Sequence, residues 1–363
     1  MGREWDAIVV GAGIIGCAVG RELARRGART AILESRRAGG GATQASAGVL
    51  APYIEAPDGG PLHELTVRSL GLYDRFVSEL EHDIESRLEY RRCGTLEVAA
   101  DARSAARLEA LAGWTRSAGV EARWLRGEDA SRLEPALGAS EGALLVPTHG
   151  YVCAAQLTAA LLEAAARRGA EFFPGRAVEK IAYDGAGVRV TVGGETLQAT
   201  TVVIAAGSWS GRIAPDGPRV TPIRGQLLRL SWTGPPITRV LWGERCYVVP
   251  WEDKTLLVGA TVEDVGFDER TTVEGVRGLL AASCSLLSGA GDATFIEVRA
   301  GLRPATVDGL PIIGRSPEHP ALVYATGHYR NGILLAPLTA LLVGDLVVDG
   351  RADSALGLTA PSR

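Results

Sequence analysis

The first 34 residues alternate between short apolar runs and a helical stripe. Residues 8–10 form a continuous apolar run, typical of a parallel strand buried on both faces. Ile15, Val19 and Leu23 then recur every four residues, as on one face of a helix. A second strand-like run follows at residues 30–33. This order predicts a strand, a helix packed on the sheet, and a neighbouring strand.

The patterns farther along the chain predict two stretches that differ in their secondary structure. Up to residue 220, helical stripes alternate with strand-like runs, as in an α/β domain. From 221 to 300, short strands follow one another around a single helix, as in an α+β insertion. The expected helices cover residues 65–80, 105–117, 155–168, 273–287 and a final apolar stretch from 333, and the expected strands cover residues 91–100, 142–147, 171–173, 188–192, 196–204, 226–230, 246–250, 255–261, 295–298 and 321–326.

Length and charge narrow the class of protein. A chain of 363 residues exceeds what one hydrophobic core usually organises, so two domains are expected. The hydrophobic content of 46% is ample for burial. The formal net charge of -4 gives no electrostatic reason to bind nucleic acid or an anionic membrane. We therefore predict a globular protein with no nucleic-acid partner.

The spacing of the cysteines and histidines favours reduced thiols and argues against a metal site. The five cysteines are odd in number, widely spaced and form no CxxC pair, which favours reduced thiols and a cytoplasmic protein. The five histidines never pair at ligand spacing, so we predict no metal site.

The N-terminal apolar run is too short for a signal peptide. Residues 333–348, interrupted by Pro337 and Asp345, fall short of a membrane span.

Glycines follow the first predicted strand at the spacing of a dinucleotide site. Gly11 permits the tight turn, Gly13 lets a pyrophosphate approach the backbone, and Gly16 lets the helix pack closely on the strand. Glu34 ends the second strand, where a carboxylate can accept both hydroxyls of an adenosine ribose. We predict a dinucleotide site, because the first strand, the glycines, the helix, the second strand and the acidic residue follow one another at the expected spacing. By themselves they leave FAD and a nicotinamide cofactor open.

Two further stretches are expected to contact the same ligand. Residues 36–50 are rich in glycine, alanine and hydroxyl groups. Such a loop could be a surface linker, but Thr43 and Ser46 sit where a dinucleotide leaving the first turn would pass. Residues 202–204 form a buried strand that runs into Gly207. This arrangement predicts a second close approach to the ligand, on a strand beside the first.

Several motifs together resemble the flavin-dependent D-amino-acid oxidase family. Besides the N-terminal fingerprint, they are SAG at 46–48, VVIAAGSWS at 202–210, CYVVP at 246–250, GLRPATVDGLPIIG at 301–314 and GHYRNGILLAP at 327–337. The last two are the specific ones, because many FAD and NAD proteins share the Rossmann part. The resemblance spans nearly the whole chain and is strongest to the bacterial branch that oxidises glycine in thiazole biosynthesis.

The resemblance implies an α/β plus α+β fold, in which a mainly antiparallel substrate domain is inserted into a Rossmann-type FAD-binding domain. Covalent flavin, as in one branch of the family, is not expected, because the last cysteine, Cys284, precedes the C-terminal motifs. We therefore expect noncovalent FAD. The implied boundaries are 1–83, 148–218 and 304–363 for the FAD-binding domain, and 84–147 and 219–303 for the substrate domain.

The resemblance also assigns cofactor contacts position by position. The helix that follows Asn331 would present its N-terminal amides and positive dipole end to the flavin. The implied contacts are Gly11, Gly13, Ile14, Ile15 and Gly16 at the pyrophosphate turn, Glu34 and Ser35 at the ribose, Ala42, Thr43, Ala47, Gly48 and Val49 at the phosphates and flavin, Val178 at the adenine, Gly207 at the second approach, and His328, Tyr329, Arg330, Asn331, Gly332, Ile333 and Leu334 around the isoalloxazine.

Three residues are implied to hold the substrate. Arg303 resembles the carboxylate ligand, because a planar guanidinium can grip a carboxylate with two parallel hydrogen bonds, and its neighbours predict a turn leading back to the FAD-binding domain. Tyr247 is expected to donate to the same carboxylate, although a lone strand tyrosine is more often core filler. Arg330 matches a position that contacts substrate or flavin, but it could cap a loop. His328 is expected to be structural, since the family needs no protein base.

The implied activity is oxidation of glycine and other small amines, such as sarcosine and small D-amino acids. Hydride transfer to flavin would give the imine, water would release the 2-oxo acid and ammonia, and molecular oxygen would give hydrogen peroxide. The resemblance also implies a homo-oligomer, in this case a tetramer. Trp242, Arg245 and Trp251 could reshape the pocket mouth, which leaves the preferred amine open. A dehydrogenase using a quinone or protein acceptor, and a noncatalytic flavin-binding subunit, remain alternatives.

Overall fold

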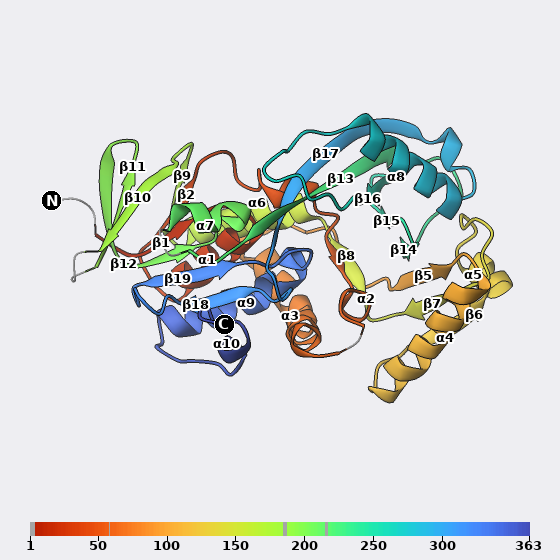
Figure 1. Cartoon of the computed structure of the whole chain (residues 1–363), viewed down its shortest axis with the longest axis horizontal. Helices are drawn as coiled ribbons and strands as arrows, with labels where there is room; N and C mark the ends of the chain where they lie inside the picture. Colours follow the sequence, from red (N-terminus) through yellow and green to blue (C-terminus); the bar gives the residue numbers. More distant parts are fainter. Residues whose placement is uncertain (1–3, 58, 184–186, 215–216) are drawn as a thin grey trace.

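The structure is a computed structural model that describes residues 4–57, 59–183, 187–214 and 217–363. Figure 1 shows two large sheets toward opposite ends of the molecule, each with helices packed against it. Strand β8 (Gly150–Val152) of a small third sheet lies between them, paired with β3 (Val49–Leu50) and β4 (Tyr90–Arg91).

The first sheet has eight strands, in the order β10-β11-β12-β1-β2-β9, and β19 joins it by pairing with β12 and β18. At its centre β1 is parallel to both β2 and β12. Ala7 and Val9 of β1 enter one hydrophobic core, whereas Ile8 and Val10 enter another, so the strand must be apolar throughout. The strands are β1 (Glu4–Val10), β2 (Thr30–Glu34), β9 (Glu171–Pro174), β10 (Val178–Tyr183), β11 (Val188–Val192), β12 (Glu195–Ile204), β18 (Ile312–Arg315) and β19 (Leu322–Thr326).

Four long helices bury their apolar sides in one core beside this sheet. They are α1 (Ile14–Arg25), α3 (Pro61–Ile84), α6 (Ala154–Arg167) and α9 (Gly332–Val347). Helix α1 contacts both α6 and α9, and α3 also packs on α9. The short helical segments of this part are η1 (Ala42–Ala45), α2 (Pro52–Glu55), η2 (Gly207–Trp209), α7 (Ser210–Ile213) and α10 (Ala355–Leu358).

The second sheet also has eight strands, in the order β17-β13-β16-β15-β14-β5-β7-β6, and most of its neighbours are antiparallel. Its strands are β5 (Thr95–Ala99), β6 (Arg123–Arg126), β7 (Gly142–Val146), β13 (Thr221–Ser231), β14 (Val240–Trp242), β15 (Tyr247–Pro250), β16 (Thr255–Gly259) and β17 (Thr294–Ala305). Its helices are α4 (Ala102–Ser117), α5 (Gly127–Leu133), α8 (Val273–Leu286) and η3 (Ala290–Asp292).

The predicted strand, helix and strand at the N-terminus are confirmed as β1, α1 and β2. The strands predicted at 188–192 and 196–204 are β11 and β12, which pair as antiparallel neighbours, and the end of β12 runs beside β1 as expected. The loop expected at 36–50 contains η1 and begins β3.

One local prediction was wrong. The strand expected at 295–298 extends through Ala305, so Arg303 lies within β17 and not in a turn. Glycine and proline around Arg303 argued for a turn, but β17 is an edge strand, where proline is tolerated.

The predicted domain boundaries stay a prediction, although the two sheets draw on different stretches of chain. In the part of the chain that the structure describes, no helix is long and apolar enough to cross a membrane.

Candidate active site

A cavity of about 430 Å³ begins at the carboxyl ends of the central parallel strands and reaches the second sheet. Val10, Leu33 and Ala205 line it from the first sheet, and Tyr247 and Arg303 line it from the second. In open α/β sheets, ligands bind at this strand edge. The cavity therefore joins the predicted nucleotide site to the predicted substrate site.

The turn from β1 to α1 depends on Gly11. Its φ of +104° lies where side chains are strained, and an added Cβ would stand 2.6 Å from the carbonyl oxygen of Ala205 on the neighbouring chain segment. Gly11 thus lets the ends of β1 and β12 approach each other closely. Gly207, which follows this segment, lines the cavity, and its contact with the ligand stays a prediction.

Glu34 lies at one end of the cavity. Its carboxylate accepts hydrogen bonds from the backbone N–H groups of Ala12 and Arg36, each at 2.8 Å. Arg176, whose N–H donates to the Glu34 carbonyl at 2.7 Å, and Val178 line the same end. The carboxylate is therefore held in place at the end of β2, where the sequence predicted ribose binding.

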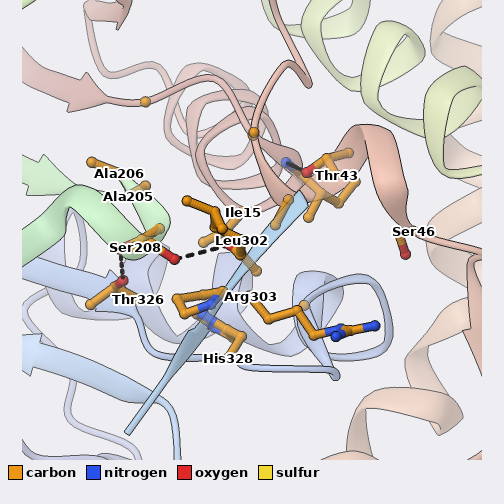
Figure 2. A pocket seen from close by; sticks show the side chains of 18 of the residues that line it. Ile15, Thr43, Ser46, Ala205, Ala206, Ser208, Leu302, Arg303, Thr326 and His328 are labelled. Carbon is orange, nitrogen blue, oxygen red and sulfur yellow. Dashed lines mark hydrogen bonds between the residues drawn. The ribbon is translucent and has the colours of Figure 1, made fainter. Parts of the chain in front are cut away.

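Segment η1 covers the start of α1. The Thr43 hydroxyl accepts a hydrogen bond from the backbone N–H of Ile14 at 3.1 Å, which supplies a partner for one first-turn donor of the helix. Figure 2 shows Thr43 beside this helix and Ser46 farther along the same wall. Both line the cavity, which supports the prediction that this loop contacts the ligand and is not a surface linker.

Hydroxyl groups tie the strand that carries Arg303 to the first sheet. The Ser208 hydroxyl donates to the carbonyl of Leu302 at 2.9 Å, as Figure 2 shows. The Thr326 hydroxyl donates to the carbonyl of Gly207 at 3.0 Å. Because Leu302 directly precedes Arg303, these bonds set the position of the arginine relative to the nucleotide turn.

The Arg303 guanidinium lies against the backbone of neighbouring strands. Its Nη1 donates to the carbonyl of Thr261 at 3.0 Å. A Cβ added to Gly225 of β13 would stand only 2.2 Å from the guanidinium. Glycine is therefore required at 225 for Arg303 to lie flat on the sheet.

Tyr247, Arg330 and Glu55 line the same end of the cavity as Arg303. The Tyr247 ring lies 5.1 Å from the ring of Trp242, and the Arg330 guanidinium lies 5.8 Å from that tryptophan ring, centroid distances in each case. Arg330 Nε is 3.2 Å from Glu55 Oε2, and the Glu55 side chain is 15% exposed. Four segments that are distant in sequence meet here.

Charge at this end favours an anionic ligand. Burial raises the pKa of the Glu55 carboxyl, while the guanidinium groups of Arg330 and Arg303 oppose that rise. Burial also raises the pKa of Tyr247, against the opposing effect of the same two arginines. Tyr247 therefore keeps its proton at neutral pH and can donate a hydrogen bond. Two guanidinium groups beside one carboxyl leave a positive balance, suited to a substrate carboxylate.

His328 is buried, and its environment matches a structural role. Burial lowers the pKa of its imidazole to about 3. Its Nε2 is 2.9 Å from the Thr339 hydroxyl on α9. The ring is thus neutral at working pH and held against the helix that follows it.

The cavity gathers nearly all residues that the sequence singled out. Gly16 and Leu334 do not line it: a Cβ on Gly16 would stand 1.8 Å from the Gly11 carbonyl oxygen, and Leu334 packs in the core beside α9. The predicted residues that do line it are Gly11, Gly13, Ile14, Ile15, Glu34, Ser35, Ala42, Thr43, Ala47, Gly48, Val49, Val178, Gly207, Tyr247, Arg303, His328, Tyr329, Arg330, Asn331, Gly332 and Ile333.

Sequence reasoning missed Glu55. It ends the short helix α2, a few residues after the lining segment that ends at Val49, and that position was the only available signal. Its ion pair with Arg330 joins two residues far apart in the chain, which no local pattern reveals. Of the three residues predicted at the pocket mouth, Trp242 lines the cavity, whereas Arg245 and Trp251 are outside its lining.

The residues present fit an extended flavin dinucleotide. The lining includes a carboxylate suited to a ribose, a set of glycines and hydroxyl groups, and a cationic end. A Cβ on Gly13 would stand 3.5 Å from the Thr43 hydroxyl, within the space between α1 and η1 where a pyrophosphate would lie. The starts of α1 and α9 both border the cavity with donor groups.

Comparison with known proteins gives a family. The family model described as FAD dependent oxidoreductase (DAO) matches residues 6–346. The glycine oxidase of Geobacillus kaustophilus is 36% identical over 353 residues, which cover 96% of this chain and 94% of that protein. The bifunctional protein ThiO/ThiG of Nostoc sp. is 36% identical over 357 residues, which cover 97% of this chain and 54% of that protein. The crystal structure of the glycine oxidase from Geobacillus kaustophilus superposes with a TM-score of 0.94 at 35% identity and covers 99% of both chains.

Proposed function

The chain belongs to the FAD-dependent oxidoreductases of the D-amino-acid oxidase family, and from this premise we propose that it oxidises glycine and other small amines. Sarcosine and small D-amino acids fall in the same substrate class. The products are the imine, which water converts to the 2-oxo acid and ammonia or an amine, and hydrogen peroxide from molecular oxygen.

One observation carries this proposal: Arg303 and Tyr247 line the end of the FAD cavity that lies away from Glu34. Arg303 uses Nη1 on the Thr261 carbonyl and keeps further N–H donors for a ligand. A guanidinium beside a protonated phenol is a suitable receptor for a carboxylate. An α-amino acid held there by its carboxylate would have its α-carbon inside the same cavity.

Each residue has one proposed part in the reaction. Arg303 binds the substrate carboxylate, Tyr247 donates to the same group, and Arg330, held by Glu55, completes the cationic end. Bound FAD would supply the acceptor for the hydride of the α-carbon and the route by which two electrons reach oxygen. His328 is buried and engaged with Thr339, so we assign it no proton transfer.

The size of the substrate is limited by rings and charges at this end. Trp242 and Tyr247 lie 5.1 Å apart by ring centroid, and the Arg330 guanidinium lies beside Trp242. A substrate with little or no side chain avoids displacing this wall. The geometry thus supports the small amines over bulky amino acids.

We further propose that the enzyme works in the cytoplasm as a homo-oligomer and supplies the imine of glycine for thiazole synthesis. All five cysteines are free, which suits a reducing compartment. The similarity to glycine oxidase and to ThiO/ThiG supports the biosynthetic role.

The test is peroxide release by the FAD-loaded protein in air, with glycine, sarcosine, D-alanine and D-proline as substrates. We expect peroxide and, from glycine, equimolar glyoxylate. Oxidation of glycine with a quinone dye but without peroxide would identify the dehydrogenase alternative instead. A flavin that none of these amines reduces would favour the noncatalytic alternative and contradict the proposal.

A further inference from the structure

Helix α9 begins at the cavity and lacks one backbone hydrogen bond in its first turns. Asn331, Gly332 and Ile333 line the cavity, and the N-cap Asn331 makes no side-chain capping bond. The first N–H groups of a helix have no carbonyl partner within it, so they are available at this wall. Pro337 lies inside the helix. Because proline has no N–H, the carbonyl of Ile333 loses its partner in the helix.

Two hydroxyl groups of α3 bond the backbone of α9 around this missing hydrogen bond. The Tyr73 hydroxyl donates to the carbonyl of Ile333 at 2.6 Å. The Ser69 hydroxyl donates to the carbonyl of Leu334 at 2.6 Å and accepts a bond from the N–H of Leu338 at 3.4 Å. Ser69 thus bridges a carbonyl and an N–H that one helical turn separates. Both side chains are fully buried, so neither hydroxyl can exchange its partner for bulk water.

The Tyr73 ring does not need its hydroxyl to stay in place. The ring stacks on Tyr90 with a centroid distance of 5.9 Å and meets Phe76 edge-on at 6.1 Å. Burial raises the pKa of Tyr73 well above its ordinary value, so the hydroxyl stays a donor over the whole working range. The hydroxyl is therefore available to hold α9, independently of the ring packing.

We propose that Tyr73 and Ser69 are positioning residues for the cofactor, because they hold the first turn of α9 so that its N–H groups face the cavity. Donors aimed at a flavin stabilise the negative charge that it gains on reduction. Loosening this turn weakens that stabilisation and the hold on FAD. The inference rests on the FAD dependence of the family and holds whichever amine is the substrate.

The experiment compares Tyr73→Phe and Ser69→Ala with two matched controls in the holoenzyme. Tyr90→Phe removes a hydroxyl from the same ring stack that bonds Asp74 instead of α9. Thr66→Val removes a buried hydroxyl of α3 that bonds only carbonyls of α3 itself. The readouts are flavin release on dilution, followed by fluorescence, and the midpoint potential of the bound flavin.

We expect the two test variants to release FAD roughly tenfold more readily and to shift the flavin potential to more negative values. The controls should keep both properties of the parent protein. Test variants that melt earlier but retain the parental FAD release and potential would overturn the inference, because only a structural role would then remain.

A second background keeps the inference testable if a single variant folds poorly. Pro337→Ala restores an N–H opposite the Ile333 carbonyl. In that background Tyr73→Phe should change FAD release by less than twofold, because the carbonyl has another partner. An equal effect of Tyr73→Phe in both backgrounds would refute the proposed link between the hydroxyl and the missing hydrogen bond.

Discussion

The two ends of the cavity are built in different ways. The end around Glu34, where we propose that the ribose binds, is made mainly by residues 11–34, joined by Arg176 and Val178, and its groups for a ligand are backbone N–H groups and the held carboxylate of Glu34. The substrate end takes Glu55, Tyr247, Arg303 and Arg330 from four distant segments, and its ligand groups are charged or phenolic side chains.

This difference implies that one set of groups binds the cofactor and another set selects the substrate. Backbone donors at a helix start recognise a pyrophosphate whatever the side chains are, which suits a shared cofactor. Side chains brought together from several segments can change one at a time, which suits a variable substrate. Changes at one end should therefore leave the property of the other end almost untouched.

The largest expected effect comes from Arg303→Ala. Loss of a charge-assisted pair with the substrate carboxylate should raise the KM for glycine roughly 100- to 1000-fold. FAD should stay bound with the parental affinity. Arg299→Ala is the control, because Arg299 lies on the same strand, pairs with Glu297 and is outside the cavity lining. Steady-state kinetics by peroxide release measures both, and an unchanged KM would refute the assigned role.

A smaller effect is expected from Gly225→Ala. The new methyl group would displace the Arg303 guanidinium, which lies 2.2 Å from the ideal Cβ position, and a displaced anchor should raise the KM roughly 10- to 100-fold. Gly71→Ala in α3 is the control, since its Cβ would meet nothing within 4 Å. Equal KM values for the two variants would show that the flat position of Arg303 is not needed.

Acid should destabilise the protein through two buried neutral histidines. Burial lowers the pKa of His149 and of His328 to about 3 from an ordinary 6.5. His149 Nε2 accepts the N–H of Tyr53 on α2 at 3.4 Å, and its Nδ1 is 2.7 Å from the Thr95 hydroxyl. Below pH 6.5 these histidines are protonated in the unfolded chain but stay neutral in the folded chain. The free energy of unfolding therefore falls as the pH falls toward 3.

The expected loss is about 2 kcal/mol per histidine between pH 7.5 and pH 5. Urea unfolding of the holoenzyme at several pH values measures it. His149→Gln should remove about one proton from the slope over this range. A slope that is the same in the parent and in the variant would show that His149 is not kept neutral.

The smallest effect is expected from Glu34→Gln at the ribose end. The amide keeps the shape but loses the charge, so FAD should bind about tenfold more weakly while the KM for glycine at saturating FAD stays the same. Glu163→Gln is the control, since that residue forms an exposed ion pair with Arg167 on α6. A raised KM in Glu34→Gln would break the separation of the two ends.

The ribose end was predictable from sequence because its signals are local. Turn, helix face and terminal acid lie within a single β-α-β unit, and each follows from short-range geometry. The structure accordingly has Gly11, Gly13 and Glu34 at the positions that the spacing predicted.

The substrate end was only partly predictable. Tyr247, Arg303 and Arg330 were named through family motifs, whereas Glu55 was missed because its partner Arg330 is distant in the chain. The strand around Arg303 was read as a turn, since glycine and proline usually break strands and edge position is a tertiary property. Leu334 is outside the cavity lining and its carbonyl bonds Ser69 in the contact between α3 and α9, and its predicted contact with the flavin stays a prediction.

Anaerobic mixing of the FAD-loaded protein with glycine tests the central claim most directly. The flavin absorbance should be lost in a single turnover, with a rate that saturates at low glycine in the parent and in Glu34→Gln, and only at far higher glycine in Arg303→Ala. A flavin that stays oxidised with glycine, sarcosine, D-alanine and D-proline would contradict the account. So would a glycine dependence that Arg303→Ala leaves unchanged.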